Sequence, residues 1–317
     1  MTQRSDRIGI RHRSSRKRIR QTSTELFTQA LVAGVVIGVL YALMAMGITF
    51  IYSIVRLINW AMGGFYMVGS YLQFVLVTMV FGVDRWWIAV PITVGIVFLL
   101  GAVLEPLLIR PMFSRGIERK DEYATVVTIS LLLFMTAVAN GLSGPYERTP
   151  GSNLGTVTLG PLPVDGARFA AFVVAIAGLA IFYAFIRKTW LGMALRAAAD
   201  SRLGVQTAGV DLQRLDQFAF GAGVALAALA GALLAPVFLV YPTNGALTTV
   251  KGFEIIIIGG LGSIPGALVG GLLLGIAESL GTVMLAPEYQ NAYGFLLVLI
   301  ILLIRPVGLF GRRLREV

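Results

Sequence analysis

The sequence predicts an all-α protein that crosses a membrane several times. Of its 317 residues, 57% are hydrophobic and only 13% are charged, which is about half the charged share of an ordinary soluble domain. Eight stretches are apolar enough to approach the roughly 20 residues that a helix needs to cross a bilayer. This composition excludes a typical soluble enzyme and any disordered or fibrous protein.

The eight hydrophobic stretches fall into two kinds. Two of them, residues 58–81 and 253–278, are interrupted by glycine, and the run Gly-Gly-Leu-Gly-Ser-Ile-Pro-Gly at residues 259–266 should break its helix. Broken backbone at membrane depth is tolerated only inside protein or beside a polar cavity, so these segments predict a transport pathway and are expected to be re-entrant. The six continuous stretches cover residues 27–52, 86–109, 123–142, 169–186, 218–241 and 292–304.

The basic residues predict which loops face the cytoplasm. If both glycine-broken segments return to the side they entered, 21 of the 26 Lys and Arg residues lie inside. This arrangement satisfies the positive-inside rule and predicts that the N- and C-termini are both cytoplasmic. The five basic residues expected outside are Arg56, Arg85, Arg148, Arg168 and Lys251.

The domain organisation follows from the same pattern. Residues 1–24 form a basic tail, residues 25–312 a transmembrane domain, and residues 313–317 a short C-terminal tail. The basic tail is expected to contact anionic lipid headgroups, and this replaces the nucleic-acid partner that a net charge of +10 would suggest on a soluble chain. Residues 143–168 are expected to be an outer connector with strand-like alternation at residues 156–159.

The residues that usually carry chemistry are scarce. There is no cysteine and the only histidine is His12, which excludes thiolate catalysis, Cys-based metal sites and multi-histidine metal sites. Glu105 and Glu278 lie near the ends of apolar segments, where most carboxylates are merely interfacial. We therefore predict no catalytic residue, no metal site and no cofactor.

A basic loop at residues 187–216 predicts two short helices outside the membrane. The first has an apolar face, a second one begins near Ser201, and Gly209 ends it. Such a face needs either a groove on a partner or a headgroup interface, and the loop alone favours neither. Arg196 and Asp200 are spaced to pair with each other or to meet a partner.

Four segments resemble the permease subunits of ATP-binding-cassette importers for branched-chain amino acids. They are KGFEIIIIGGLGSIPGALVGGLLLGIAE at 251–278, RPVGLFG at 305–311, GMALRAAADSRLGVQTAGV at 192–210 and INWAMGGFYMVGSYL at 58–72. The resemblance covers roughly residues 26–312. It implies that the 187–216 loop docks an ATPase, with matching positions at Gly192, Arg196, Ala197, Asp200 and Gly209.

The resemblance also implies the partners of the chain. Two permeases, related or identical, would work with cytoplasmic ATPase subunits and an extracytoplasmic substrate-binding protein in a bacterial-type inner membrane. The sequence contains no G-x-x-x-x-G-K-[ST] motif, so ATP hydrolysis is expected in a partner and not in this chain.

The candidate substrate pathway combines residues of the two glycine-rich segments. Where the family usually has His or Gln followed by an acidic residue, this chain has Met62 and Gly64, which implies weak contact with the substrate. The polar side chains could instead bond between helices, and the glycines could serve close packing. The candidates are Asn59, Met62, Gly63, Gly64, Tyr66, Ser70, Gly259, Gly260, Gly262 and Ser263.

These observations predict a permease subunit of an ATP-driven importer for branched-chain amino acids or related small carboxylate or amide solutes. A stand-alone secondary transporter or channel is the alternative, but it would need a coupling site, typically built from intramembrane Asp, Glu or His. A non-transporting membrane scaffold is a further alternative, and an enzyme is the least supported class.

Overall fold

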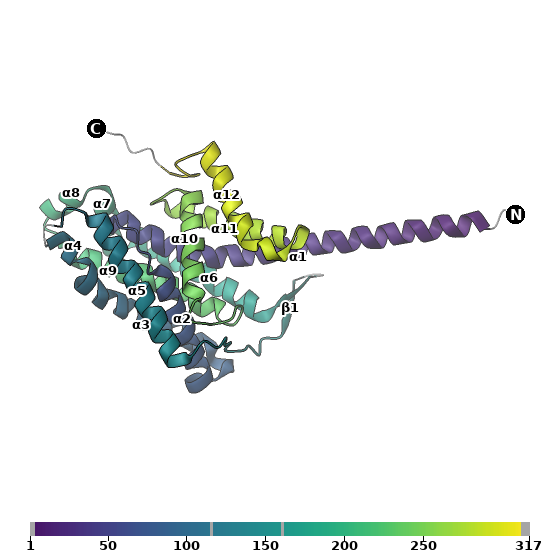
Figure 1. Cartoon of the computed structure of the whole chain (residues 1–317), viewed down its shortest axis with the longest axis horizontal. Helices are drawn as coiled ribbons and strands as arrows, with labels where there is room; N and C mark the ends of the chain where they lie inside the picture. The colour runs from purple at the N-terminus through teal and green to yellow at the C-terminus, as the bar shows by residue number, and fades with distance from the viewer. Residues whose placement is uncertain (1–3, 115–116, 160–161, 312–317) are drawn as a thin grey trace.

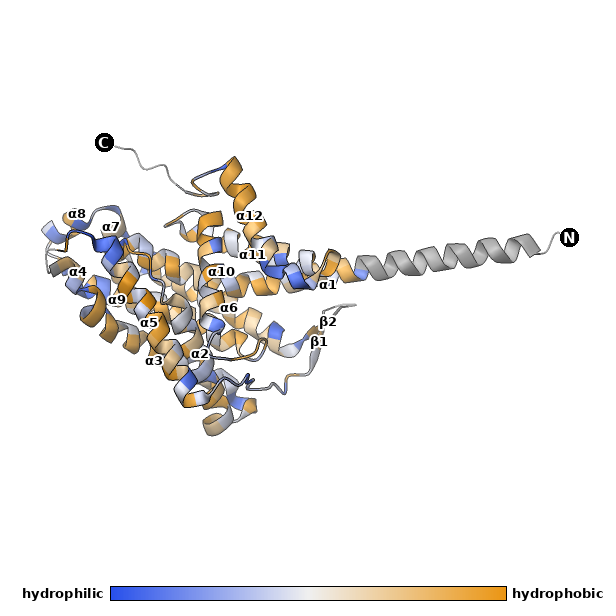
Figure 2. Ribbon diagram, viewed as in Figure 1, coloured by the Kyte–Doolittle hydropathy of each residue, from blue (hydrophilic) through white to orange (hydrophobic). Residues whose placement is uncertain are grey.

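The computed structural model describes residues 4–114, 117–159 and 162–311, which form a bundle of helices with a single hairpin of strands (Figure 1). Eight helical segments in this described part are long and apolar enough to cross a membrane. The predicted all-α, multi-pass fold is confirmed. Figure 2 shows hydrophobic residues along the bodies of the helices and hydrophilic residues mainly at their ends.

The first half of the chain contributes the elements up to the hairpin. The basic tail of residues 1–24 and its predicted lipid contact lie outside the residues whose side chains are described. The elements are α1 (Arg4–Val55), α2 (Met62–Val75) with a π-helical extension (Leu76–Phe81), a short 3₁₀ turn (Val83–Arg85), α3 (Trp86–Leu104) with a π-helical extension (Glu105–Ile109), α4 (Pro111–Ser114), α5 (Lys120–Ser143), β1 (Thr156–Leu159) and β2 (Leu162–Asp165).

The elements that the structure describes in the second half are all helices, apart from an isolated β-bridge between Val240 and Arg148. This half contains the two short helices expected in the basic loop, followed by four longer helices. The elements are α6 (Gly166–Lys188), α7 (Trp190–Asp200), α8 (Arg202–Thr207), α9 (Leu212–Leu234), α10 (Asn244–Gly259), α11 (Ile264–Met284), a 3₁₀ turn (Pro287–Tyr289) and α12 (Gln290–Ile304).

Helices α1 and α9 form the centre of the bundle. In the most apolar stretch of α9, 83% of residues are buried, whereas the corresponding value for α12 is 11%. The exposed helices α3, α5, α6 and α12 therefore present their apolar side chains outward, as expected for surfaces that meet lipid or another membrane subunit.

Helices α1 and α11 pack closely against each other, and glycines at their interface make this close approach possible. A Cβ atom on Gly34 would lie 2.8 Å from the Cα atom of Ile276, and one on Gly38 would lie 2.8 Å from the Cα atom of Leu272. Membrane helices use small residues in this way, because the backbones can then approach closely and gain dispersion contacts.

The end of α1 meets the basic loop, which corrects the predicted topology. Arg56 follows α1 and donates from Nη2 to the carbonyl oxygen of Ala199 in α7, at 2.8 Å. Arg56 and the loop thus lie at the same end of the bundle, with α4, α7 and α8, and not on opposite sides as predicted (Figure 1).

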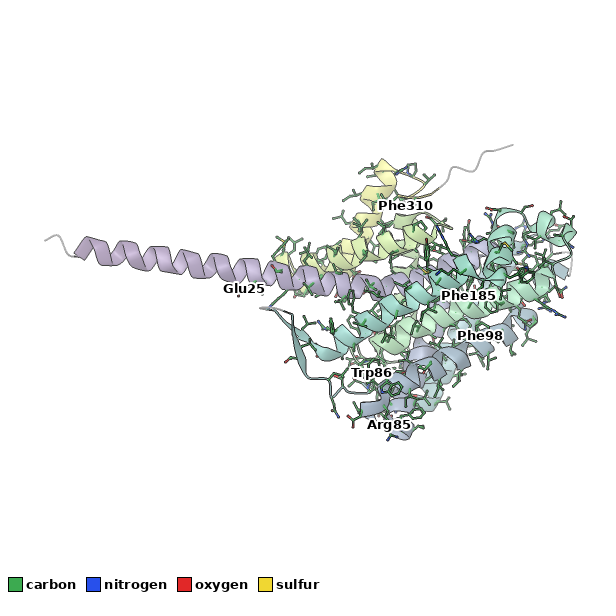
Figure 3. The ribbon with its side chains drawn as sticks, turned by 180° about the vertical axis from the view of Figure 1, so that it is seen from behind. Glu25, Arg85, Trp86, Phe98, Phe185 and Phe310 are labelled. Carbon is green, nitrogen blue, oxygen red and sulfur yellow. The ribbon has the colours of Figure 1, made fainter. Side chains whose placement is uncertain are left out.

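The two ends of the described chain do not lie together. Ser279 near the end of α11 donates to the carbonyl oxygen of Ala30 near the start of the membrane-spanning part of α1. Phe310, by contrast, bonds to Gly259 at the far end of α10, close to where α1 ends. Figure 3 shows the same separation between Glu25 on α1 and Phe185 near the basic loop. The start of the membrane-spanning part of α1 and the segment around Phe310 therefore lie near opposite ends of the bundle.

The two glycine-rich segments behave differently. The chain is broken at residues 260–263 as predicted, but in the first segment α2 runs without interruption through Gly63, Gly64 and Gly69. The break there precedes the glycines, at residues 56–61. The prediction of a helix broken by Gly63 and Gly64 is wrong, because these glycines serve close approach to neighbouring helices.

The connector at residues 143–168 carries the predicted strand. β1 pairs with β2 in antiparallel register, with Thr156 opposite Asp165. Asp165 then caps α6 by accepting from the backbone N–H groups of Ala167 and Arg168. The hairpin lies at the end of the bundle away from α7 and α8 (Figure 1).

Candidate docking surface and transport pathway

Helix α7 is anchored tightly to the end of α6. Thr189 caps it by accepting from the N–H of Gly192 at 3.0 Å. A Cβ atom on Gly192 would overlap the carbonyl oxygens of Phe185 and Ile186 at the end of α6. Gly192, one of the predicted docking residues, therefore allows α7 to pack closely on α6. The inward side of α7 is buried, including Leu195 at 1% exposure.

The outward side of α7 and α8 leaves apolar residues uncovered. Trp190, Met193 and Leu203 are 67%, 54% and 72% exposed. Among the predicted docking residues Arg196, Ala197, Asp200 and Gly209 are also exposed, and Gly209 ends the α8 turn with a φ of 80°. Arg196 and Asp200, both described, form no ion pair with each other. Their side chains are therefore available to a partner.

The predicted pathway residues of the first segment build the turn into α2. Asn59 is buried; its Oδ1 accepts from the N–H of Ala61 at 2.9 Å, and its Nδ2 lies 3.5 Å from Sδ of Met62. Gly63 donates from its N–H to Oγ1 of Thr249 at 3.1 Å, which ties the start of α2 to α10. A Cβ atom on Gly63 would overlap the carbonyl oxygen of Gly245.

The remaining residues of this group face neighbouring helices. Gly64 lies against Met135 of α5. The hydroxyl of Ser70 is 3.0 Å from the carbonyl oxygen of Tyr66 and 3.1 Å from that of Gly231 in α9. Ser70 therefore bonds between helices, and the side chain of Tyr66 is buried beside it.

The second group forms the turn between α10 and α11. Gly260 and Gly262 have φ values of 98° and 80°, which L side chains rarely adopt. Ser263 caps α11 by accepting from the N–H of Gly266 at 3.1 Å. The carbonyl oxygen of Gly259 is bonded by the N–H of Phe310, so the C-terminal segment lies over this turn.

The two predicted groups are not brought together. The first group contacts α10 at Gly245, near the start of this helix. The second group includes Gly259, at the end of the same helix. The length of α10, about 20 Å, therefore separates the two groups. Sequence reasoning missed three residues beside the first group. These are Thr249, Asn244, whose buried Oδ1 has no partner, and Phe253, whose ring centroid lies 4.6 Å from that of Trp60.

A cluster of charged residues lies inside the bundle. Lys251 forms an ion pair with Glu278, which also accepts from the hydroxyl of Tyr41 and from Nε2 of Gln290, each at 3.3 Å. Lys251 is therefore not in an outer loop, and Glu278, 2% exposed, is not interfacial as expected. One turn beyond Lys251, Glu254 is also buried and its Oε2 has no partner. The pairing could have been predicted from the sequence, because Lys251 and Glu278 both lie within apolar segments, where a charge needs a partner.

Glu105 is likewise buried, at 1% exposure, and pairs with Arg110 at 3.0 Å. Its predicted interfacial position is corrected to a buried one near the end of the bundle that holds α4. In the part of the chain that the structure describes, no three His, Asp or Glu side chains gather as metal ligands would.

A shallow depression with an accessible volume of about 20 Å³ lies at the end of the bundle opposite α7 and α8. It is bounded by α2, α3, α6, α9 and residues 150–154, and its walls are mainly apolar. None of the ten predicted pathway residues lines it; Gln73, Trp86, Ala171 and Leu233 do. Its accessible volume is little more than one water needs, so the depression is a narrow apolar recess at the end of the bundle where the hairpin lies.

Comparison with known proteins agrees with this architecture. Residues 30–304 match a family described as the permease component of branched-chain amino acid transport systems. LivH of Escherichia coli, a high-affinity branched-chain amino acid transport system permease protein, is 31% identical over 90% of this chain and 96% of its own length.

Two further relatives give the same result. BraD of Pseudomonas aeruginosa, another such permease protein, is 32% identical over 90% of this chain and 96% of its own. A probable LivH of Methanocaldococcus jannaschii is 30% identical, covering 89% of this chain and 91% of its own. No solved structure matches the chain significantly. The chain belongs to the permease-component family of branched-chain amino acid transport systems.

Proposed function

We propose that the chain is the transmembrane permease subunit of an ATP-driven importer for branched-chain amino acids or closely related solutes. The observation that carries the proposal is the outward side of α7 and α8, which leaves Trp190, Met193 and Leu203 exposed at one end of a membrane bundle. Isolated exposed apolar residues need no explanation, but three on two adjoining helices favour a protein partner. In this proposal that partner is an ATPase subunit, which the chain's place in a transport system with other components supports.

The end that carries α7 and α8 faces the cytoplasm in this proposal, because ATP is there. Charge supports the orientation. Among described residues from Glu25 onward, that end holds the basic residues Arg56, Arg110, Arg119, Lys120, Arg187, Lys188, Arg196, Arg202, Arg214 and Arg305, whereas the hairpin end holds Arg85, Arg148 and Arg168.

The orientation also places the hairpin and the apolar depression at the outer face. An extracytoplasmic binding protein would deliver the solute there, and the membrane would be a bacterial-type inner membrane. The start of the membrane-spanning part of α1 then lies at the outer face, the reverse of the predicted cytoplasmic N-terminus.

The pathway is proposed to run beside α10. Asn244, Thr249 and Trp60 lie at the meeting of α2 and α10, and the unpartnered Oδ1 of Asn244 offers an acceptor to a passing solute. Asn59, Gly63 and the other residues of the first group would shape this segment, and Gly259–Ser263 would form the inner turn. A second permease, related or identical, would complete the pathway.

Uptake measurements test this function. The chain can be reconstituted in vesicles with its second permease, its ATPase and its binding protein. These vesicles should take up labelled leucine only when ATP is supplied on the side of the membrane where the ATPase is bound. Unchanged uptake without ATP would contradict the proposal.

The alternative of a secondary transporter is favoured by one observation, the buried cluster of Lys251, Glu254 and Glu278. Intramembrane carboxylates are the usual coupling groups of such transporters. Uptake that continues without ATP and stops when ion gradients are collapsed would support this alternative instead.

A further inference from the structure

The end of α1 and the α7–α8 loop are joined by a reciprocal pair of hydrogen bonds. Arg202, at the start of α8, donates from Nη1 to the carbonyl oxygen of Ile54 at 2.7 Å. Arg56 donates from Nη2 to the carbonyl oxygen of Ala199 at 2.8 Å. Both acceptors lie in the last turn of a helix, where carbonyl groups lack an intrahelical partner and a cation interacts favourably with the helix dipole.

Arg202 is held at the same time by α9. Its Nη1 and Nη2 donate to Oδ1 and Oδ2 of Asp216 at 3.0 and 2.6 Å, a bidentate geometry that fixes the guanidinium plane. The guanidinium carbon lies 5.2 Å from the ring centroid of Phe113. The Asp216 side chain is only 6% exposed, so this pair is largely shielded from water and from salt. One side chain thereby joins α8, α1 and α9.

Arg56 has an unusual backbone. Its φ of 60° makes it the one non-glycine residue with positive φ in the part of the chain that the structure describes. Such a conformation persists only when its surroundings impose it. Arg56 lies where α1 ends and the chain turns toward α2. Its side chain, which donates to the carbonyl oxygen of Ala199, is therefore attached at this turn.

The short connection after Arg56 leads directly into the proposed pathway. Asn59 holds the turn, Gly63 bonds Thr249 of α10, and the rings of Trp60 and Phe253 are in contact. A displacement of the α7–α8 loop would thus pull on the end of α1 and, through five residues, on the start of α2.

We propose that Arg56 and Arg202 couple the α7–α8 loop to the pathway. The inference rests on the proposed function, in which an ATPase moves this loop. The two arginines are positioning residues: they touch neither solute nor ATP, and they make the end of α1 and the start of α9 follow the loop. Without them the loop would move while α2 stayed in place, and ATP would be hydrolysed without transport.

Arg56 gives the cleaner test, because Arg56→Gly removes the guanidinium while glycine adopts the same φ without strain. In vesicles containing the complete transporter, we expect the variant to assemble and hydrolyse ATP. The amount of solute transported per ATP should fall by about fivefold or more. An effect of about fivefold is the lower end of the range by which one site typically changes another. Arg56→Lys, which keeps a cationic donor, should retain most of the coupling.

A matched control separates this effect from a general loss of charge. Arg119 forms an exposed ion pair with Glu122 outside the 187–216 loop, and Arg119→Ala should leave the transport-to-hydrolysis ratio unchanged. A double variant, Arg202→Met with Asp216→Asn, removes the second arm without leaving a buried carboxylate unpaired, and it should lower the ratio as well.

Two results would overturn the inference in different ways. If Arg56→Gly and the double variant both transport as much solute per ATP as the unchanged chain, the coupling role is wrong and the proposed function stands. If the unchanged chain itself fails to assemble with an ATPase, or transports without ATP, the proposed function and the inference both fall.

Discussion

Lys251 and Glu278 form an ion pair between α10 and α11 in the interior of the bundle, where Glu278 is 2% exposed. Tyr41 of α1 and Gln290 of α12 complete the surroundings of the carboxylate. Four helices therefore meet at one charged pair that water barely reaches. Because an isolated charge is expensive at membrane depth, each partner depends on the other.

Glu278→Gln should destabilise the protein substantially, because it leaves the ammonium group of Lys251 buried without its partner. Breaking a buried pair from one side typically costs about 3 kcal/mol. The midpoint of thermal unfolding in detergent should fall clearly.

Glu254→Gln is the matched control, since Glu254 lies one turn from Lys251 but forms no ion pair with it, and its Oε2 makes no hydrogen bond. It should shift the midpoint much less. Equal shifts for the two variants would show that the ion pair has no special role in stability.

Gly38→Val should disrupt the contact between α1 and α11, because a Cβ atom on Gly38 would lie 2.8 Å from backbone of the facing helix. Overpacking of this kind typically costs about 1–3 kcal/mol, and here the obstructing atom is backbone that cannot move aside. The yield of folded protein after extraction reports the effect.

Gly95→Val provides the comparison, because a Cβ atom there would have no atom within 4 Å. Gly95 lies inside α3 just as Gly38 lies inside α1. A loss of folded protein that is as large for Gly95→Val would point to helix propensity and away from close packing.

Ser263→Ala should weaken the start of α11 by about 1 kcal/mol, the usual effect of removing an N-cap. Ser263→Asp retains an acceptor for the N–H of Gly266 and should be close to neutral. Thermal unfolding of the purified protein distinguishes them. If alanine and aspartate behave alike, the cap is not what holds this turn.

The sidedness of the bundle can be measured directly, because the natural chain contains no cysteine. Ser152→Cys and Gln206→Cys place single thiols on exposed residues near opposite ends of the bundle. A membrane-impermeant maleimide added outside intact cells should label Ser152→Cys and leave Gln206→Cys unlabelled until the membrane is opened. The reverse pattern would invert the proposed orientation.

Local patterns explain why part of the site was predictable. The turn at residues 260–263 could be predicted because glycines that adopt positive φ and a serine that caps the next helix act within a few residues of each other. The helices α7 and α8 followed from equally local signals, an apolar face for α7 and a capping residue, Ser201, for α8.

Tertiary contacts explain why the rest was not predictable. Gly63 looks like a helix breaker in sequence, but its role is to admit Gly245, which is far away along the chain. Similarly, Arg56 adopts a φ that its residue type does not suggest, and its contact with Ala199 decides which end of α1 meets the loop. A count of charged residues cannot detect that contact, so Arg56 and the α7–α8 loop were predicted on opposite sides although they lie together.

The central claim is that the outward side of α7 and α8 docks an ATPase, and Arg196→Glu tests it most directly. Arg196 is exposed and forms no ion pair among the described residues, so reversing its charge should leave the fold intact. Arg168→Glu, on an exposed residue near the hairpin, is the control.

The measurement is the amount of ATPase subunit that copurifies with each variant of the tagged permease. We predict that the unchanged chain and Arg168→Glu retain the ATPase, whereas Arg196→Glu loses it together with ATP-dependent uptake. Full copurification and full uptake with Arg196→Glu would contradict the docking surface on α7 and α8.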